Sequence, residues 1–175
     1  MEIHAGIDLS LRSTGISILR DDGKLLDFCL VSHTEKDEEL LVKNAVSILL
    51  FLKKFDPDRI TIEGLSFGAI SGSKDILQGN FWFLRCNIWK SFIRVPVEIV
   101  AVSRWRKYVI PKERARILKV SGEKFWQKEE CVRKLPKDVR ERFDKYLKEN
   151  KFPKKCLYDL TDSYWIANYS LLTDK

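Results

Sequence analysis

Histidine is scarce in this chain: its 175 residues include only two, and these do not form a cluster. The four cysteines are widely separated without a Cys-x-x-Cys pair, which argues against a zinc site or a disulfide framework and favours a reducing, cytoplasmic compartment. No run of eighteen apolar residues is present and the N-terminus does not have the pattern of a signal peptide, so we expect no membrane span. These absences exclude most histidine-based catalysis and most zinc or copper chemistry.

The positive charge of the chain is concentrated in one third of it. Residues 103–155 contain 19 Lys and Arg against 8 Asp and Glu, a balance of +11, whereas the whole chain carries +7. Within this third, Arg104, Arg106 and Lys107 alternate with aromatic residues, a pattern suited to phosphate contact with stacking on bases. Nucleic acid is therefore the favoured partner. The alternative is that these cations only solvate helix surfaces.

The length predicts one domain, 1–175, in which 103–155 is a basic helical insertion. A helix is predicted over about 36–55, with Thr34 as its capping residue. The strand at 59–63 follows that helix, so it should pair in parallel with the first strand. The first three strands form an antiparallel meander because short turns join them: 2–8, 14–20 and 25–31.

The rest of the sequence predicts four further helices and one further strand. Pro96 near the start of that strand indicates the edge of the sheet. The sequence thus predicts an α/β fold with a five-stranded mixed sheet, three antiparallel strands followed by parallel ones, flanked by helices. The remaining elements are a helix at about 74–93, the strand at 95–102, and helices at about 124–134, 136–150 and 157–172.

Two predicted strands end on an acid, Asp8 and Glu63. A central strand is apolar on both faces, so an acid there has no packing reason, although Asp8 alone could be a turn residue. Parallel pairing of these strands places the two carboxylates side by side at the carboxyl edge of the sheet. Open α/β sheets bind their ligands at that edge.

Asp159 and Asp162 are predicted in the first turn of the last helix. Acids are favoured there by the helix dipole, but the i,i+3 spacing points both side chains the same way. Ile166 and Tyr169 continue this face, so we expect it to pack on the sheet with two carboxylates at one end. Four carboxylates on three elements favour Mg²⁺ or Mn²⁺, and burying them together without a cation would be unfavourable.

The order of these acids along the chain resembles that of a known family, the RuvC-type Holliday-junction resolvases of the RNase H-like superfamily. The resemblance covers nearly the whole chain and is greater to the bacteriophage members. It implies an RNase H-like fold. It also implies that four residues bind the metal and act in catalysis: Asp8, Glu63, Asp159 and Asp162. The motifs that carry the resemblance are Gly6-Ile7-Asp8, Ile62-Glu63 and Asp159-Leu160-Thr161-Asp162.

The same resemblance implies an activity and partners. The chain is expected to be a crossover junction endodeoxyribonuclease that resolves four-way DNA junctions by paired nicks. It is expected to act as a homodimer in the cytoplasm, which would be the host cytoplasm if the protein is phage-encoded. Two Mg²⁺ or Mn²⁺ ions per site would support hydrolysis, with no small-molecule cofactor. Asp8 is the expected bridging ligand, Glu63 and Asp159 complete the ion sites, and Asp162 binds an ion or orients water.

Residues for DNA contact also follow from the resemblance. Phe67 would be the aromatic wedge at the junction, one position later than in the family, and Lys128 would offset phosphate charge in the transition state. Arg104 and Lys107 resemble part of the family's basic segment. Leu9-Ser10 stands where the family commonly has Pro-Gly, so the turn after Asp8 departs from its pattern.

Two other classes of function stay open on the sequence. The first is a different RNase H-like nuclease that acts on RNA/DNA hybrid, flap DNA or structured RNA. The second is a protein without nuclease activity, either an actin-like nucleotide-binding fragment or a silent DNA-binding module. The actin-like fragment would need a second phosphate loop. The silent DNA-binding module would have no use for four convergent acids.

Overall fold

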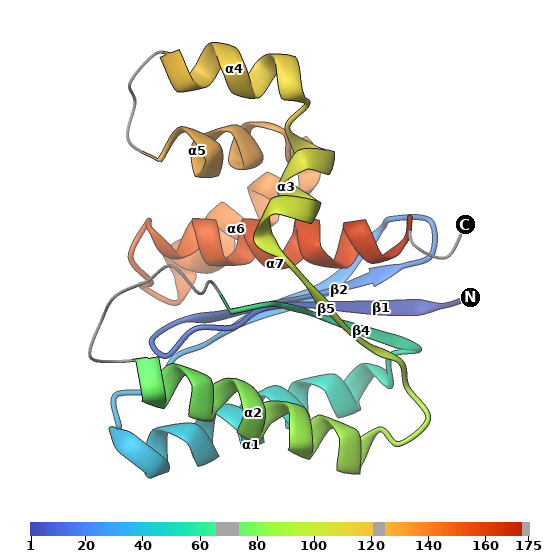
Figure 1. Ribbon diagram of the computed structural model, residues 1–175, viewed down its shortest axis with the longest axis vertical. Coiled ribbons are helices and arrows are strands. Elements are labelled where there is room, and N and C mark those ends of the chain that lie inside the picture. Colours follow the sequence, from blue (N-terminus) through green and yellow to red (C-terminus); the bar gives the residue numbers. More distant parts are fainter. Residues whose placement is uncertain (66–73, 121–124, 173–175) are drawn as a thin grey trace.

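The computed structural model describes residues 1–65, 74–120 and 125–172. Its centre is a five-stranded sheet with the order β3-β2-β1-β4-β5, which lies between two layers of helices (Figure 1). The strands agree closely with the predicted ones, and the predicted mixed sheet is confirmed. They are β1 (Ile3–Asp8), β2 (Thr14–Arg20), β3 (Leu25–Val31), β4 (Arg59–Glu63) and β5 (Val97–Val100).

The strand pairing follows the expected topology. β1, β2 and β3 form an antiparallel meander, and β4 pairs in parallel with β1 on one side and with β5 on the other. β5 begins directly after Pro96 and is an edge strand, as the proline predicted. Ile7 pairs with Ile62, so the carboxyl ends of β1 and β4 lie next to each other.

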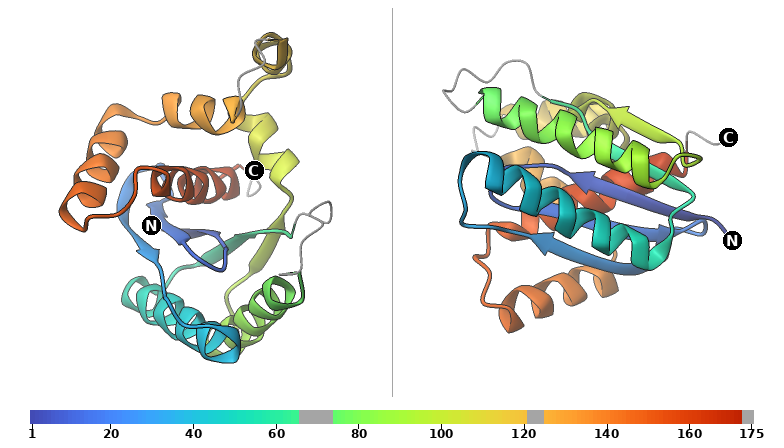
Figure 2. Two further views of the ribbon diagram at one scale, coloured as in Figure 1. Left: turned by 90° about the vertical axis from the view of Figure 1, so that its left-hand side faces the viewer. Right: turned by 90° about the horizontal axis from the view of Figure 1, so that it is seen from below.

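The helices cover the sheet unequally. α1 and α2 lie on one face, whereas α7 lies across the other face and is surrounded by α3, α5 and α6 (Figures 1 and 2). α4 lies farthest from the sheet, at the top of Figure 1. The helices are α1 (Asp37–Phe55), α2 (Lys74–Ser91), α3 (Val102–Val109), α4 (Lys112–Val120), α5 (Trp126–Arg133), α6 (Lys137–Glu149) and α7 (Cys156–Ser170).

Two details of the predicted helices are wrong. The N-cap of α1 is Lys36, not Thr34, and no side chain caps this end; three acids in the first turn offset the helix dipole instead. α7 begins at Cys156, so only Asp159 lies in its first turn and Asp162 lies beyond it. The described parts of the basic segment form α3 to α6, and the sequence did not predict α3 and α4 as separate helices.

Two glycines let α7 lie directly on the sheet. A Cβ atom on Gly15 would be 2.1 Å from the backbone oxygen of Asp159, and one on Gly6 would be 2.3 Å from that of Ser163. No side chain fits at such distances, so only glycine permits this approach. The Ser17 and Ser163 hydroxyls hydrogen-bond across the same contact at 2.8 Å. Small residues on β1 and β2 thus set how close α7 comes to the ends of these strands.

The cores on the two faces of the sheet are built separately. Apolar residues of β1, β2 and β4 meet α1 and α2 on one face, where Ile48, Leu52, Leu84 and Ile88 are fully buried. On the other face, β2 and β3 pack with α6 and α7. In the described ranges, no helix has the length and apolar character needed to cross a membrane.

Candidate active site

The four predicted acids come together at one edge of the sheet. Asp8 and Glu63 end the adjacent strands β1 and β4, and Asp8 also pairs in register with Gly15 of β2. Because Gly15 contacts the backbone of Asp159, the start of α7 lies over the end of β1. Asp162 follows one turn later and is 2% exposed. The proximity of Asp8 and Glu63 expected from the strand order is thereby borne out by the fold.

The electrostatics of these acids reflect their crowding. Burial raises the pKa of Asp8 well above its usual range, and the charges of Asp162, Glu63 and Asp159 raise it further. Burial and the charge of Asp162 also raise the pKa of Glu63, to about 7. Burial raises the pKa of both Asp159 and Asp162. A group of carboxylates with raised pKa values is unstable as a set of anions unless cations are near.

Cations of the chain lie close to the acids. Arg106 donates from Nη2 to Oδ2 of Asp162 at 3.1 Å and forms an ion pair with it. Lys128, on α5, lowers the pKa of all four acids by its charge, and its Nζ lies 5.4 Å from the centre of the Tyr158 ring. Lys155 also lowers the pKa of Asp159 by its charge, and the pKa values of all four acids stay raised despite these cations, which favours the binding of further positive charge.

The residues present fit a divalent cation in chemistry. All four are carboxylates, the ligands preferred by Mg²⁺ and Mn²⁺, and Oδ1 of Asp162 is buried with no hydrogen-bond partner in the described part of the chain. Yet across residues 1–65, 74–120 and 125–172, no three potential ligand side chains are arranged to hold an ion as they stand. Glu63 and Asp162 are instead engaged by α3, since Trp105 Nε1 donates to Oε2 of Glu63 at 2.9 Å.

The turn after Asp8 is held by its own hydroxyl groups. The Ser10 hydroxyl donates to the Ser13 carbonyl at 2.8 Å and accepts from the Ser13 amide at 2.9 Å. The Thr14 hydroxyl donates to the Ser10 carbonyl at 3.0 Å, and the Ser13 hydroxyl donates to Sγ of Cys156 in α7 at 3.7 Å. Although Leu9-Ser10 departs from the family's usual pair, the turn is ordered by serine and threonine side chains and lies against α7.

The predicted DNA-binding residues occupy different environments. Arg104 and Lys107 are exposed on α3, whereas Arg106 turns inward to Asp162 and Lys128 faces the four acids. Phe67 lies outside the described residues. The stacking interpretation of the basic segment is wrong for one aromatic residue, Trp105, because its ring is fully buried and donates to Glu63. A tryptophan between arginines in the sequence gave no signal of this contact.

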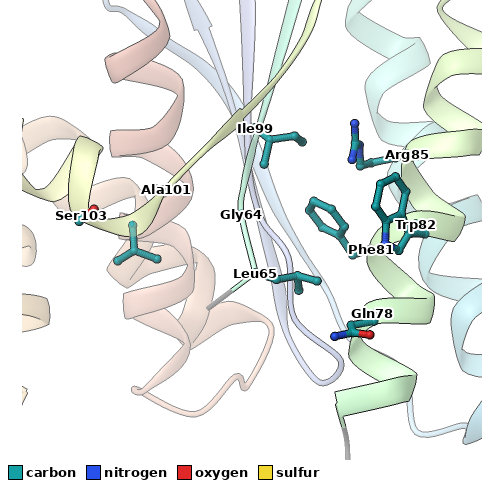
Figure 3. Close-up of a pocket in the computed structure, with 10 residues that line it drawn as sticks. Gly64, Leu65, Gln78, Phe81, Trp82, Arg85, Ile99, Ala101 and Ser103 are labelled. Atoms are coloured by element: carbon teal, nitrogen blue, oxygen red, sulfur yellow. The ribbon is translucent and has the colours of Figure 1, made fainter. Parts of the chain in front are cut away.

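A cavity of about 710 Å³ lies beside the acids but is not formed by them. It begins at Gly64, directly after Glu63, and Leu65, Phe81 and Ile99 line it together with Arg85 (Figure 3). Its walls are mainly apolar, so it is not suited to a phosphate or a metal ion. The oxygen ligands that a metal ion needs are at the carboxylate edge and not in this cavity.

The sheet order, the parallel β1–β4 pair and α7 across the sheet define an RNase H-like fold of the RuvC type. The structure is similar to that of Thermus thermophilus RuvC in complex with a Holliday junction substrate, with a TM-score of 0.64 and 16% identity, over 99% of this chain and 96% of that one. It is also similar to the fowlpox virus Holliday junction resolvase, with a TM-score of 0.54 and 14% identity, over 99% of each chain. No protein-family profile matches the chain, and no curated protein matches its sequence.

Proposed function

We propose that the chain is a metal-dependent endonuclease that resolves four-way DNA junctions. The observation that carries the proposal is the gathering of Asp8, Glu63, Asp159 and Asp162 at one edge of the sheet. Burial raises the pKa of all four, and the charges of neighbouring acids raise the pKa of Asp8, Glu63 and Asp162 further. A protein does not keep four crowded acids for stability, because each opposes the ionisation of the others. Their use is to hold cations.

The roles of the chain's residues follow from where they lie. Asp8, on the central strand β1, is the proposed shared ligand, with Glu63 at the end of the adjacent strand β4 and Asp159 and Asp162 on α7. When bound, Mg²⁺ or Mn²⁺ ions supply a water of lowered pKa and positive charge beside the leaving oxygen. Lys128 faces the same acids and would stabilise the charge on the scissile phosphate.

Four-way junction DNA is the proposed substrate for two reasons. The fold is shared with structures of RuvC and of fowlpox virus resolvase, both of which have been solved with Holliday junction DNA. The basic segment 103–155 places α3 and α5 next to the acids, with Arg104 and Lys107 exposed on α3 for contact with the phosphate backbone. The resemblance to bacteriophage members stays a prediction.

A homodimer is the proposed assembly, because two symmetrical nicks need two sites and the described residues form one. The surface that suits a second copy is on α2 and the chain after it, where Trp82, Trp89 and Ile93 are 57%, 65% and 72% exposed. Large exposed apolar side chains of this kind are typical of interfaces. Sedimentation at micromolar concentration should give twice the mass of one chain, and Trp89→Glu should halve it.

Competition between DNA substrates tests the proposed function. Labelled four-way junction is bound and then displaced by unlabelled junction, duplex or RNA/DNA hybrid of equal length, at fixed salt concentration. We expect the unlabelled junction to compete at least tenfold better than the other two, in the range by which specific sites exceed non-specific ones. Equal competition by all three would contradict junction selectivity, and preference for the hybrid would favour the other RNase H-like nucleases.

A further inference from the structure

Helix α3 contacts two of the four acids through consecutive residues. Trp105 Nε1 donates to Oε2 of Glu63 at 2.9 Å, and Arg106 Nη2 donates to Oδ2 of Asp162 at 3.1 Å. Consecutive helical residues point about 100° apart, so one helix can reach a strand end and a neighbouring helix at the same time. Glu63 belongs to β4 and Asp162 to α7, and α3 therefore joins two acids from separate elements.

Both contacts are protected from solvent. The Trp105 side chain is fully buried, and the Asp162 and Arg106 side chains are 3% and 20% exposed. The Arg106 guanidinium lies 5.0 Å from the centre of the Trp105 ring, and its Nη1 also donates to Oε1 of Gln127 at 3.3 Å. The two donors thus support each other, and the orientation of the guanidinium is fixed from α5 as well.

These contacts differ from ordinary core packing because they leave a buried carboxylate oxygen without a hydrogen-bond partner among the described residues. Oδ1 of Asp162 is buried and has no hydrogen-bond partner in the described ranges, and the same holds for Nε of Arg106. An ion pair that served stability alone would satisfy both carboxylate oxygens, because a buried oxygen without a partner is unfavourable. By contrast, Trp165 Nε1 donates to the backbone oxygen of Cys131 at 3.0 Å, which is an ordinary way to satisfy a packed indole.

We propose that Trp105 and Arg106 are positioning residues, which fix the Glu63 and Asp162 carboxylates so that an oxygen of Asp162 stays available to a divalent cation. This inference rests on the proposed metal-dependent function. Ligating carboxylates are commonly held by a second hydrogen bond, and loss of that bond typically weakens metal binding by about tenfold to a hundredfold. Trp105 and Arg106 would supply those second bonds here.

The test measures Mn²⁺ binding without DNA, from the electron paramagnetic resonance signal of free Mn²⁺. Trp105→Phe keeps an aromatic ring but removes the Nε1 donor, and its matched control is Trp165→Phe, which removes an indole donor bonded to a backbone oxygen. We expect Trp105→Phe to weaken Mn²⁺ binding about tenfold or more and Trp165→Phe to change it less than about twofold. The melting temperature of each variant in chelator checks that both are folded.

A second pair of variants keeps the inference testable if Trp105→Phe does not fold. Arg106→Gln removes the partner of Asp162, and Arg104→Gln removes an exposed arginine of the same helix. Loss of a positive charge alone would strengthen Mn²⁺ binding, so the direction in which the affinity changes separates the two roles of Arg106. Weaker binding in Arg106→Gln but not in Arg104→Gln supports positioning, whereas tighter binding would show that Arg106 competes with the ion.

The results separate this inference from the proposed function. Wild-type protein that binds no Mn²⁺ would overturn the metal-dependent function and the positioning role together. Wild-type binding that is unchanged in both Trp105→Phe and Arg106→Gln would overturn the positioning role alone. If Trp105→Phe and Trp165→Phe weakened Mn²⁺ binding equally, the effect of Trp105→Phe would come from lost packing and the positioning role would be overturned.

Discussion

The two charged regions of this molecule are built in opposite ways. The acids Asp8, Glu63, Asp159 and Asp162 are few, crowded and held by the sheet and α7, so their pKa values are raised. The cations of residues 103–155 are numerous, spread over α3 to α6 and mostly exposed. Arg106 and Lys128 are less exposed and lie at the boundary between the two regions, where they face the acids.

The difference between the buried acids and the exposed cations shows that the acids say more about function. A buried carboxylate beside others is unfavourable for folding, so its presence needs an explanation in terms of a cation. An exposed lysine has little energetic consequence and can lie almost anywhere on the surface. Individual acids therefore identify the site, whereas the cations indicate a partner only as a group.

The largest effect is expected where the backbone brings the acids together. Gly15→Ala would place a Cβ atom 2.1 Å from the Asp159 backbone oxygen, so α7 must move away from β2. We expect a loss of about 3 kcal/mol or more in the free energy of unfolding, by overpacking, measured by urea denaturation. The same substitution at Gly79 in α2 meets Leu41 at 3.5 Å and should stabilise the helix by about 1 kcal/mol. Equal effects at both sites would contradict the close contact of α7 with the sheet.

The basic region should act through salt-dependent DNA binding. Neutralising Arg104 and Lys107 together removes two exposed cations of α3, so the slope of log affinity against log salt should fall by about 2. The control pair, Lys36→Gln with Lys53→Gln, neutralises cations at α1 on the other face of the sheet. A slope that responds equally to both pairs would show that α3 has no special part in the contact.

The smallest effect concerns the stability of the metal-free protein. Because the folded state raises the pKa of these acids, with Glu63 at about 7, it holds protons that the unfolded chain has already lost. Stability in chelator should therefore fall as pH rises from about 5 to about 8. Asp8→Asn should reduce this fall and raise the melting temperature at the higher pH by a few degrees, roughly 1 kcal/mol in stability.

The matched control for that measurement is Asp138→Asn, at an exposed position in the first turn of α6. It lacks the crowding of the site, so its pH dependence should follow that of the wild type. A wild-type melting temperature that rises with pH over this range would show that the four acids are not crowded in the metal-free protein.

Much of the fold could be predicted because its signals are local. β1 to β4 were predicted within one residue at each end, and the helix between β3 and β4 favoured the parallel β1–β4 pair. That pairing in turn placed Asp8 beside Glu63. Asp159 and Asp162 were predicted from their i,i+3 spacing and from the apolar face that follows them.

The contacts that complete the site depend on tertiary packing and could not be predicted. Nothing in the sequence near Trp105 indicates that its indole reaches Glu63, since the local pattern of arginines and aromatics is equally typical of a surface that stacks on bases. The need for glycine at position 15 is likewise visible only when Asp159 lies against it. Both depend on residues 42 or more positions apart in the chain.

Cleavage of a four-way junction by the wild type and by Asp8→Asn tests the central claim most directly. With Mg²⁺ or Mn²⁺ present, the wild type should nick the junction and stop when the ion is chelated. Asp8→Asn should lose activity by roughly 10³-fold or more, as expected when a group that acts in the transition state is lost, while it still binds the junction. An Asp8→Asn protein that cuts at a near-normal rate would contradict the assignment of the four acids as a metal-binding nuclease centre.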